Sequence, residues 1–303
     1  MVTSLQAKSL LLLLVMLLFL ITGTVSCASV NTHLVVGGKL DTEAQILTKI
    51  YVLLLRHVGL DVIERAKLGT NKDVFAAISS GQIDLYPEFT ADGLAKLNLS
   101  KTRDQQHDYA AIKRGYEANY HITWLNPAPL NDTYGICTLK TTANDLHVTK
   151  ISQLAPLVSR LVIATPPDGL SDPNVLPGLQ GTYGFSFPRS NILTTTDTTA
   201  EAKTFQAVIQ GQAQLNICYT TSPLISQDNF VLLLDDLNSF PVYDLAPIVR
   251  DDALARVPEI ADILNKLAPK LTTDVSVMLQ AQVTSGFSVE TVATKWLQSQ
   301  GLL

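Results

Sequence analysis

The sequence is poor in charge and in catalytic or metal-binding motifs, and each shortage argues against a class of function. Only 16% of its 303 residues are charged, and no run of lysine or arginine forms a basic patch, so nucleic acid is not an expected partner. The five histidines lack metal-ligand spacing, and no Gly-x-Ser-x-Gly motif occurs. We therefore predict no cofactor, no metal and no enzymatic activity. The alternative is a hydrolase using Asp84, Glu88 or Asp92, but these residues fit a strand end and a loop better than a catalytic pair.

Long apolar runs are also scarce, because only Leu10–Ile21 is unbroken, and its twelve residues fall short of the roughly 20 that a membrane span needs. Lys8 precedes this run and small residues follow it, so residues 1–27 are predicted to be a secretory signal peptide. The stretch Thr24–Cys27 resembles a bacterial lipobox, in which Cys27 would become the lipid-modified first residue. The alternative is an ordinary signal peptide with a chance cysteine. Both interpretations place the mature chain outside the cytoplasm, and the first anchors it to the outer face of the cytoplasmic membrane.

Two further cysteines remain, Cys137 and Cys218, each within a short apolar run that is typical of a strand. An even pair in an exported protein can form a disulfide. Two buried free thiols are the alternative.

Hydrophobic residues make up 47% of the chain, and apolar runs alternate with helical patterns almost throughout. The segment Thr42–Val58 is predicted to be a helix, with Thr42 and Gln45 as a capping box at its start. Other expected strands are 34–36, 60–64, 83–86, 134–138, 161–165, 215–218 and 230–234, and other expected helices are 71–80, 103–120, 250–256, 258–268, 272–282 and 288–300. This alternation predicts an α/β fold with largely parallel sheets.

One pattern occurs in both halves of the chain. Phe89 follows Gly81 by eight residues, Tyr219 follows Gly211 by eight residues, and each aromatic residue is followed by threonine. The expected unit is a helix, a glycine that ends it, a buried strand, and a loop at the carboxyl end of that strand. Ligands bind at such loops in open α/β sheets, so the repeat predicts two similar lobes that present aromatic residues to one site.

Several motifs occur in the same order as in a known family. They are Gly37–Glu43, Ser80–Thr90, Asn131–Gly135, Leu176–Leu179 with Tyr183–Phe185, Cys218–Thr221, Phe240–Tyr243 with Ala246–Arg250, and the ending Trp296–Leu303. With these motifs the chain resembles the binding proteins of glycine betaine, choline and carnitine ABC importers. The resemblance covers nearly all of the chain after residue 33.

The resemblance implies a type II, two-lobed fold like that of periplasmic binding proteins, with two crossover strands. Lobe one would be residues 28–135 and 240–303, and lobe two residues 136–239. The expected function is capture of choline, glycine betaine or carnitine for an ABC permease, by a monomer. A binding protein for another small zwitterion or amine, and a ligand-sensing lipoprotein without a transport role, are the alternatives.

The family holds a quaternary ammonium group in a cage of aromatic rings, because such a group has no N–H to donate. The positions matching its motifs are Phe89, Tyr134 and Tyr219; Tyr243 is a further candidate, and Tyr183 is a guess for one more cage residue. Phe75, Tyr86 and Phe205 are interpreted as core residues.

The start of the helix at Thr42 offers N–H groups to a ligand carboxylate, so Thr42 and Gln45 are candidate contacts there. The family often has a glutamine where this chain has Ala44. Asp92 is either a contact for the ligand cation or a helix cap on the surface. Together, Asp41 and Asp92 favour a pure cation such as choline over a carboxylated betaine.

Overall fold

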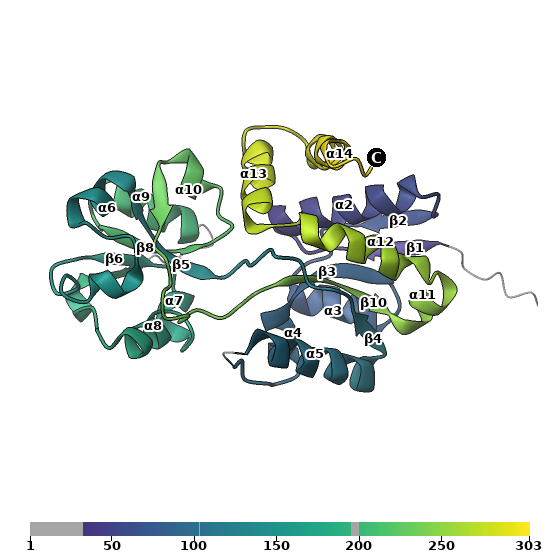
Figure 1. Cartoon of the computed structure of the whole chain (residues 1–303), viewed down its shortest axis with the longest axis horizontal. Helices are drawn as coiled ribbons and strands as arrows, with labels where there is room; N and C mark the ends of the chain where they lie inside the picture. Colours follow the sequence, from purple (N-terminus) through teal and green to yellow (C-terminus); the bar gives the residue numbers. More distant parts are fainter. Residues whose placement is uncertain (1–32, 103, 195–199) are drawn as a thin grey trace, which may run out of the picture. The chain divides into compact units, whose positions relative to one another are not determined.

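The computed structural model describes residues 33–102, 104–194 and 200–303 and contains two five-stranded sheets (Figure 1). The first sheet has the order β2 (Val62–Arg65), β1 (Leu34–Gly37), β3 (Leu85–Phe89), β10 (Leu245–Arg250) and β4 (Ile122–Trp124). The second has the order β7 (Ile192–Thr194), β6 (Ile163–Thr165), β8 (Leu215–Tyr219), β5 (Tyr134–Leu139) and β9 (Phe230–Leu232). The predicted signal peptide and Cys27 lie outside the described residues.

The two sheets share one topology. In the first, β1 runs parallel to β2 and β3, while β10 runs antiparallel to β3 and β4. In the second, β6 runs parallel to β7 and β8, while β5 runs antiparallel to β8 and β9. The antiparallel strand of each sheet is the one that enters from the other sheet. The predicted two-lobed α/β fold with two crossovers is therefore confirmed.

The predicted boundary of lobe one at residue 135 falls inside β5. Tyr134 and Gly135 pair with Tyr219 and Cys218 of the second sheet, so the strand belongs to one sheet along its whole length. We therefore propose that lobe two begins at Tyr134, and the boundary at residue 240 stays a prediction.

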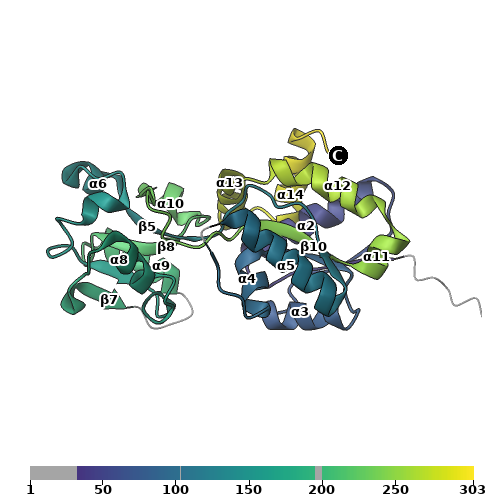
Figure 2. The ribbon, with the colours of Figure 1, turned by 60° about the horizontal axis from the view of Figure 1, so that its bottom comes forward.

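Helices cover both faces of the first sheet (Figure 2). Those packing on one face are α2 (Thr42–His57), α11 (Asp251–Arg256), α12 (Glu259–Leu267), α13 (Thr273–Thr284) and α14 (Val289–Ser299). Those on the other are α3 (Asn71–Ser79), α4 (Thr90–Lys96) and α5 (Gln105–Tyr120). Successive side chains of a strand point to opposite faces of the sheet. In β1, Leu34 and Val36 therefore lie in the core under α2, whereas Val35 packs against the core under α3.

The second sheet is built in the same way from shorter helices. They are α6 (Lys140–Leu146), α7 (Asp168–Ser171), α8 (Leu176–Tyr183), α9 (Ala200–Ile209) and α10 (Leu224–Gln227). One core contains residues of α6 and α8, and the other contains residues of α9. Of the two alternatives for Cys137 and Cys218, the structure has the disulfide, which joins β5 to β8 inside the second core.

Both glycines of the repeated pattern end a helix as expected. Gly81 and Gly211 have φ of +76° and +73°, a backbone region that residues with a side chain seldom adopt. Each lies between a helix and the central strand of its sheet, which is β3 for Gly81 and β8 for Gly211. The capping box at Thr42 is wrong, because Asp41 is the N-cap of α2 and its carboxylate accepts from the Ala44 N–H at 2.7 Å.

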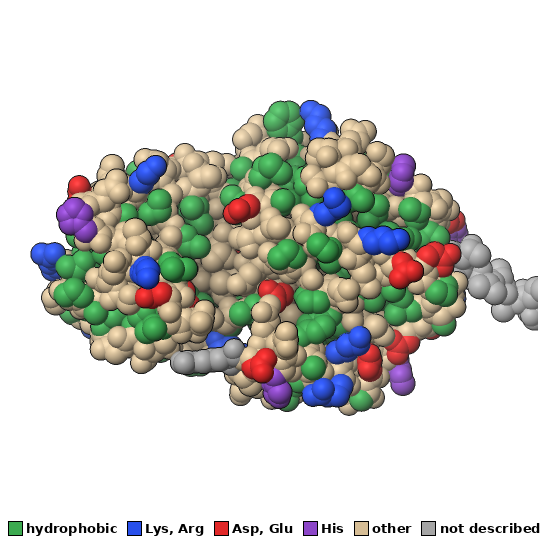
Figure 3. Space-filling model, viewed as in Figure 1, with side chains coloured by type: hydrophobic (Ala, Val, Ile, Leu, Met, Phe, Trp, Pro, Cys, Tyr) green, Lys and Arg blue, Asp and Glu red, His purple; other side chains and the backbone are tan. Residues whose placement is uncertain are grey.

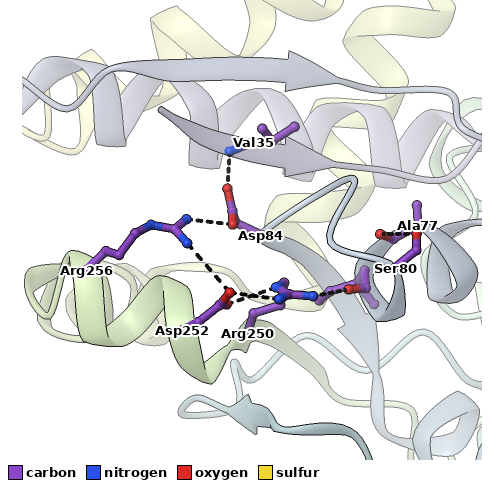
Figure 4. A network of polar contacts seen from close by, with 8 residues as sticks. Val35, Ala77, Ser80, Asp84, Arg250, Asp252 and Arg256 are labelled. Atoms are coloured by element: carbon purple, nitrogen blue, oxygen red, sulfur yellow. Dashed lines mark hydrogen bonds and ion pairs between the residues drawn. The ribbon is translucent and has the colours of Figure 1, made fainter. Parts of the chain in front are cut away.

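A polar network fixes the start of β3 (Figure 4). Asp84 accepts hydrogen bonds from the Val35 N–H and from the Arg256 guanidinium, both at 2.8 Å. Arg250 forms two hydrogen bonds with Asp252 at 2.7 and 2.9 Å. These contacts join β1, β3 and α11, so Asp84 has a structural role at the opposite end of β3 from Phe89.

The described surface agrees with the composition. On the face shown in Figure 3, lysine and arginine side chains are spread out and form no single patch. Within the part of the chain that the structure describes, no helix combines the length and the apolar character that a membrane span needs.

Candidate functional site

Three tyrosines meet where the crossovers join the sheets, and we call them the tyrosine cluster: Tyr134, Tyr219 and Tyr243. Tyr134 opens β5 and pairs with Tyr219 at the end of β8, so their rings lie side by side, with centroids 4.9 Å apart and planes at 31°. Tyr243, on the second crossover, meets Tyr134 edge to face at 6.5 Å. All three are half-buried. Their rings offer electron-rich faces at one place.

The threonines of the repeated pattern anchor the two crossovers. The Thr90 hydroxyl accepts from the Asp244 N–H at 3.0 Å, just before β10. The Thr220 hydroxyl accepts from the Thr133 N–H at 3.1 Å, just before β5. The Thr90 N–H in turn donates to the Asp244 carbonyl, and the Thr220 N–H donates to the Thr133 carbonyl. The repeat thus fixes one crossover to the end of each central strand, β3 or β8, which places Tyr134 and Tyr243 near Tyr219.

Phe89 lies in the first lobe and is 8% exposed within its core. Its ring already has a cation nearby, because Lys39 Nζ is 5.5 Å from the ring centroid. Lys39 donates to Glu88 at 2.5 Å and to Asp92 at 2.9 Å. Burial lowers the pKa of Lys39, but these two carboxylates outweigh it and leave the pKa raised. Contact between Phe89 and a ligand stays a prediction.

Asp92 is not the cap of its helix, because Phe89 is the N-cap residue of α4. Its carboxylate pairs with Lys39 and is 27% exposed. Asp92 also raises the pKa of Tyr243, although burial contributes more. Asp92 therefore lies near the tyrosine cluster, and Lys39 partly neutralises its negative charge.

Carboxyl groups lie beside the tyrosine cluster or beside one another, and we call the following set the carboxyl cluster: Asp41, Glu43, Asp92, Asp132 and Glu201. Glu43 is 6% exposed, and burial followed by the charge of Asp132 raises its pKa well above the usual range. Burial raises the pKa of Asp132 to about 6, with Asp41, Glu201 and Asp92 adding to the effect. Burial also raises the pKa of Glu201, which accepts from the Tyr219 N–H at 3.2 Å. Carboxyl groups thus lie close together at the site, and burial and their mutual repulsion oppose their ionisation.

The start of α2 is arranged differently from the prediction. Gln45 donates its amide N–H to the Leu40 carbonyl at 2.6 Å, within its own loop. Thr42 is the first residue of the helix and is half-buried. Ligand contacts of both residues stay predictions. Tyr183 is placed elsewhere in lobe two, where it stacks on Phe185 at 5.8 Å and donates to Asp235 at 2.6 Å, so the structure does not bring it to the cluster.

A cavity of about 750 Å³ follows both crossovers and reaches the cluster at Tyr134. Tyr219 and Tyr243 are not among the residues that line it, so we define the site by the rings rather than by this cavity. Lys101 also lines it, with Nζ buried and no hydrogen-bond partner among the described residues. Burial lowers the pKa of Lys101 to about 8, against the charges of Asp172 and Asp108.

Sequence reasoning missed the roles of Lys39, Glu43, Asp132, Glu201 and Lys101. Lys39 and Glu43 lie in a motif that carries the resemblance, and Asp132 directly precedes Thr133 and Tyr134, so position along the chain was an available signal for these three. Glu201 and Lys101 carry no such signal. In residues 33–102, 104–194 and 200–303, no group of three or more histidine, cysteine, aspartate or glutamate side chains is arranged to hold a metal ion.

Comparison with known proteins gives the family. Residues 32–299 match the family described as the substrate-binding domain of ABC-type glycine betaine transport systems. The glycine betaine-binding protein YehZ of Escherichia coli is 27% identical over 277 residues, which cover 88% of this chain and 90% of that protein. A glycine-betaine-binding protein of Pseudomonas aeruginosa is 29% identical over 258 residues, covering 82% and 81%.

Solved structures agree with this match. Apo YehZ of Escherichia coli superposes with a TM-score of 0.80 at 25% identity, over 90% of this chain and all of that chain. A structure titled as a glycine betaine/carnitine/choline ABC transporter superposes with a TM-score of 0.81 at 20% identity, over 89% and 99%. The predicted type II fold is confirmed by these neighbours.

Proposed function

The chain belongs to the family of substrate-binding domains of ABC-type glycine betaine transport systems, and from this premise we propose that it captures a small quaternary ammonium compound on the tyrosine cluster. It is a binding protein and not an enzyme. The observation that carries the proposal is the convergence of Tyr134, Tyr219 and Tyr243 from two strands and the second crossover.

Aromatic faces suit a quaternary ammonium group, whose diffuse charge cannot donate a hydrogen bond. Each ring contributes about 0.5–2 kcal/mol, and more when water is excluded. The carboxyl cluster adds a negative field that acts strongly in a partly buried site. Together, rings and carboxylates favour a cation over a neutral molecule of the same size.

Two observations bear on the rest of the ligand. The ammonium group of Lys101 in the adjoining cavity has no hydrogen-bond partner among the described residues, which favours a carboxylate-bearing compound such as glycine betaine or carnitine. The excess of carboxyl groups favours choline, which has a net positive charge. Removal of the charge in Lys101→Met separates the cases, since it weakens binding of the betaines and leaves choline unaffected.

Delivery to a membrane permease follows from the transport system named by the family. We propose that the chain works as a monomer outside the cytoplasm and that Cys27 carries a lipid anchor. Metabolic labelling of the full chain with a fatty acid tests the anchor, because Cys27→Ser should abolish incorporation and release the protein from the membrane.

Calorimetric titration with choline, glycine betaine, carnitine and an uncharged control tests the ligand class. Residues 28–303 contain the whole described fold and serve as the sample. We expect binding of at least one quaternary amine, weakened about 2- to 30-fold in Tyr219→Ala, as the loss of about 0.5–2 kcal/mol implies. Tyr219→Phe is the matched control, since it keeps the ring and should keep most of the affinity.

A folded sample that binds none of the amines would contradict the proposal. It would favour the alternatives of another small zwitterion or amine, or of a lipoprotein that senses a different ligand.

A further inference from the structure

Two carboxyl groups lie close together at the joint between the lobes: Glu43, buried in the first turn of α2, and Asp132, half-buried on the first crossover. Gln280 donates to Glu43 and to the Thr221 carbonyl, Thr221 donates to Asp132, and Asp132 acts on the Glu43 carboxyl group. Among the described residues, neither forms an ion pair with lysine, arginine or histidine. A hydrogen bond between two carboxyl groups needs a proton on one of them, because two carboxylates can only accept.

We propose that Glu43 and Asp132 share one proton when the site is empty, and that a cation bound on the tyrosine cluster displaces this proton. The inference rests on the proposed function and couples ligand binding to proton release. The site would then select a permanently charged cation.

Within the described part of the chain, the side chains that donate hydrogen bonds to the pair are uncharged. Ser276 donates to Glu43, and Thr221 donates to Asp132. The Gln280 amide reaches Glu43 at 3.3 Å and the Thr221 carbonyl at 3.0 Å, which joins α13 of lobe one to lobe two.

The ionisable groups that face the pair are the carboxyl groups of Asp41, Asp92 and Glu201. Lys39 is bonded to Glu88 and Asp92, so its charge is already paired. Burial and like charge therefore both oppose ionisation of the pair, as the raised pKa values of Glu43 and Asp132 indicate.

The pair is connected directly to the rings. The Asp132 N–H donates to the Tyr243 carbonyl at 3.0 Å, and Thr221, which binds the Asp132 carboxylate, lies two residues after Tyr219. Asp132 also contributes to the raised pKa of Tyr243. A cation on these rings would meet the field of Asp132 at short range and stabilise its ionised form.

The sign of the pH dependence follows. A bound cation lowers the pKa of the pair, so binding releases a proton and the affinity rises as pH rises through the range in which the empty site is protonated. At pH values well below the one at which the empty pair loses its proton, the gain approaches tenfold per pH unit for one proton released. The dependence should flatten once the empty site has lost its proton. The two groups titrate as a pair, so the midpoint belongs to both of them.

The test is titration of residues 28–303 with choline, which has no group that ionises in this range, between about pH 5 and about pH 8. Repeating it in two buffers of different ionisation enthalpy counts the protons released. We expect Kd to fall at least fivefold over this range, with up to one proton released. In Asp132→Asn and Glu43→Gln, which keep a hydrogen-bond acceptor, the pH dependence should fall below twofold.

Glu290→Gln is the matched control, since this exposed carboxylate pairs with Lys49 away from the rings and should leave the pH profile unchanged. Choline binding with the same Kd at every pH and no proton release would overturn the shared proton while leaving the proposed function standing. Absence of binding at every pH, by a folded sample, would overturn both.

Discussion

Loss of the disulfide should destabilise lobe two selectively. Cys137 and Cys218 are 81 positions apart, and closing a loop of that length lowers the entropy of the unfolded chain by an amount worth about 4.5 kcal/mol at 25 °C. Measured effects are often smaller, so we expect the free energy of unfolding of lobe two to fall by about 2–4.5 kcal/mol on reduction. With a urea m-value of about 1.5 kcal/mol/M, the midpoint would fall by about 1.3–3 M.

The two tryptophans make the assay specific to a lobe. Trp124 in β4 and Trp296 in α14 both lie in cores of lobe one, so their fluorescence reports that lobe alone, whereas far-UV circular dichroism reports both. Urea titrations of oxidised and reduced protein should show a shifted phase in dichroism and an unchanged transition in fluorescence. Reduction that leaves the dichroism midpoint unchanged would refute the reasoning, and equal shifts in both signals would show that the lobes unfold as one unit.

Three further changes have defined outcomes. Lys39→Met leaves the buried carboxylate of Glu88 without its cation, so the free energy of unfolding measured in urea should fall by about 3–5 kcal/mol. Lys49→Met is the control and should cost less than about 1 kcal/mol, because the carboxylates that pair with Lys49 are more exposed. Comparable losses in the two variants would contradict this difference. Thr220→Val removes the acceptor of a crossover N–H and should cost about 1–3 kcal/mol and weaken ligand binding; an unchanged midpoint would show that the anchor is dispensable. The pKa of Asp132 is raised to about 6, so its ionisation destabilises the fold as pH rises from about 4 to about 7. Asp132→Asn should therefore raise the urea unfolding midpoint at about pH 7 and reduce the pH dependence of stability. A lower midpoint would contradict the sign of this effect.

The parts of the fold that local sequence determines were predictable. The glycines at positions 81 and 211 and the apolar segments beside them mark the central strand of each sheet, because a positive φ and a buried strand each need particular residue types. Short elements such as α4, β4 and α6 were not predicted. Runs of three to seven residues carry too little periodicity, and packing against neighbours decides their structure.

The site was predictable only in part. Tyr134, Tyr219 and Tyr243 were named from motifs, and the structure brings them together. Contacts between distant segments could not be foreseen: Glu88 is 49 positions from Lys39, and no local pattern shows that the two form a buried pair beside Phe89.

The most direct test of cation recognition compares choline with 3,3-dimethylbutan-1-ol, which replaces the charged nitrogen by carbon and keeps the shape. Three rings at about 0.5–2 kcal/mol each predict that calorimetry finds the neutral compound bound at least about tenfold more weakly. Equal affinities for the two compounds would mean that the tyrosine cluster selects its ligand by size, and would contradict the account.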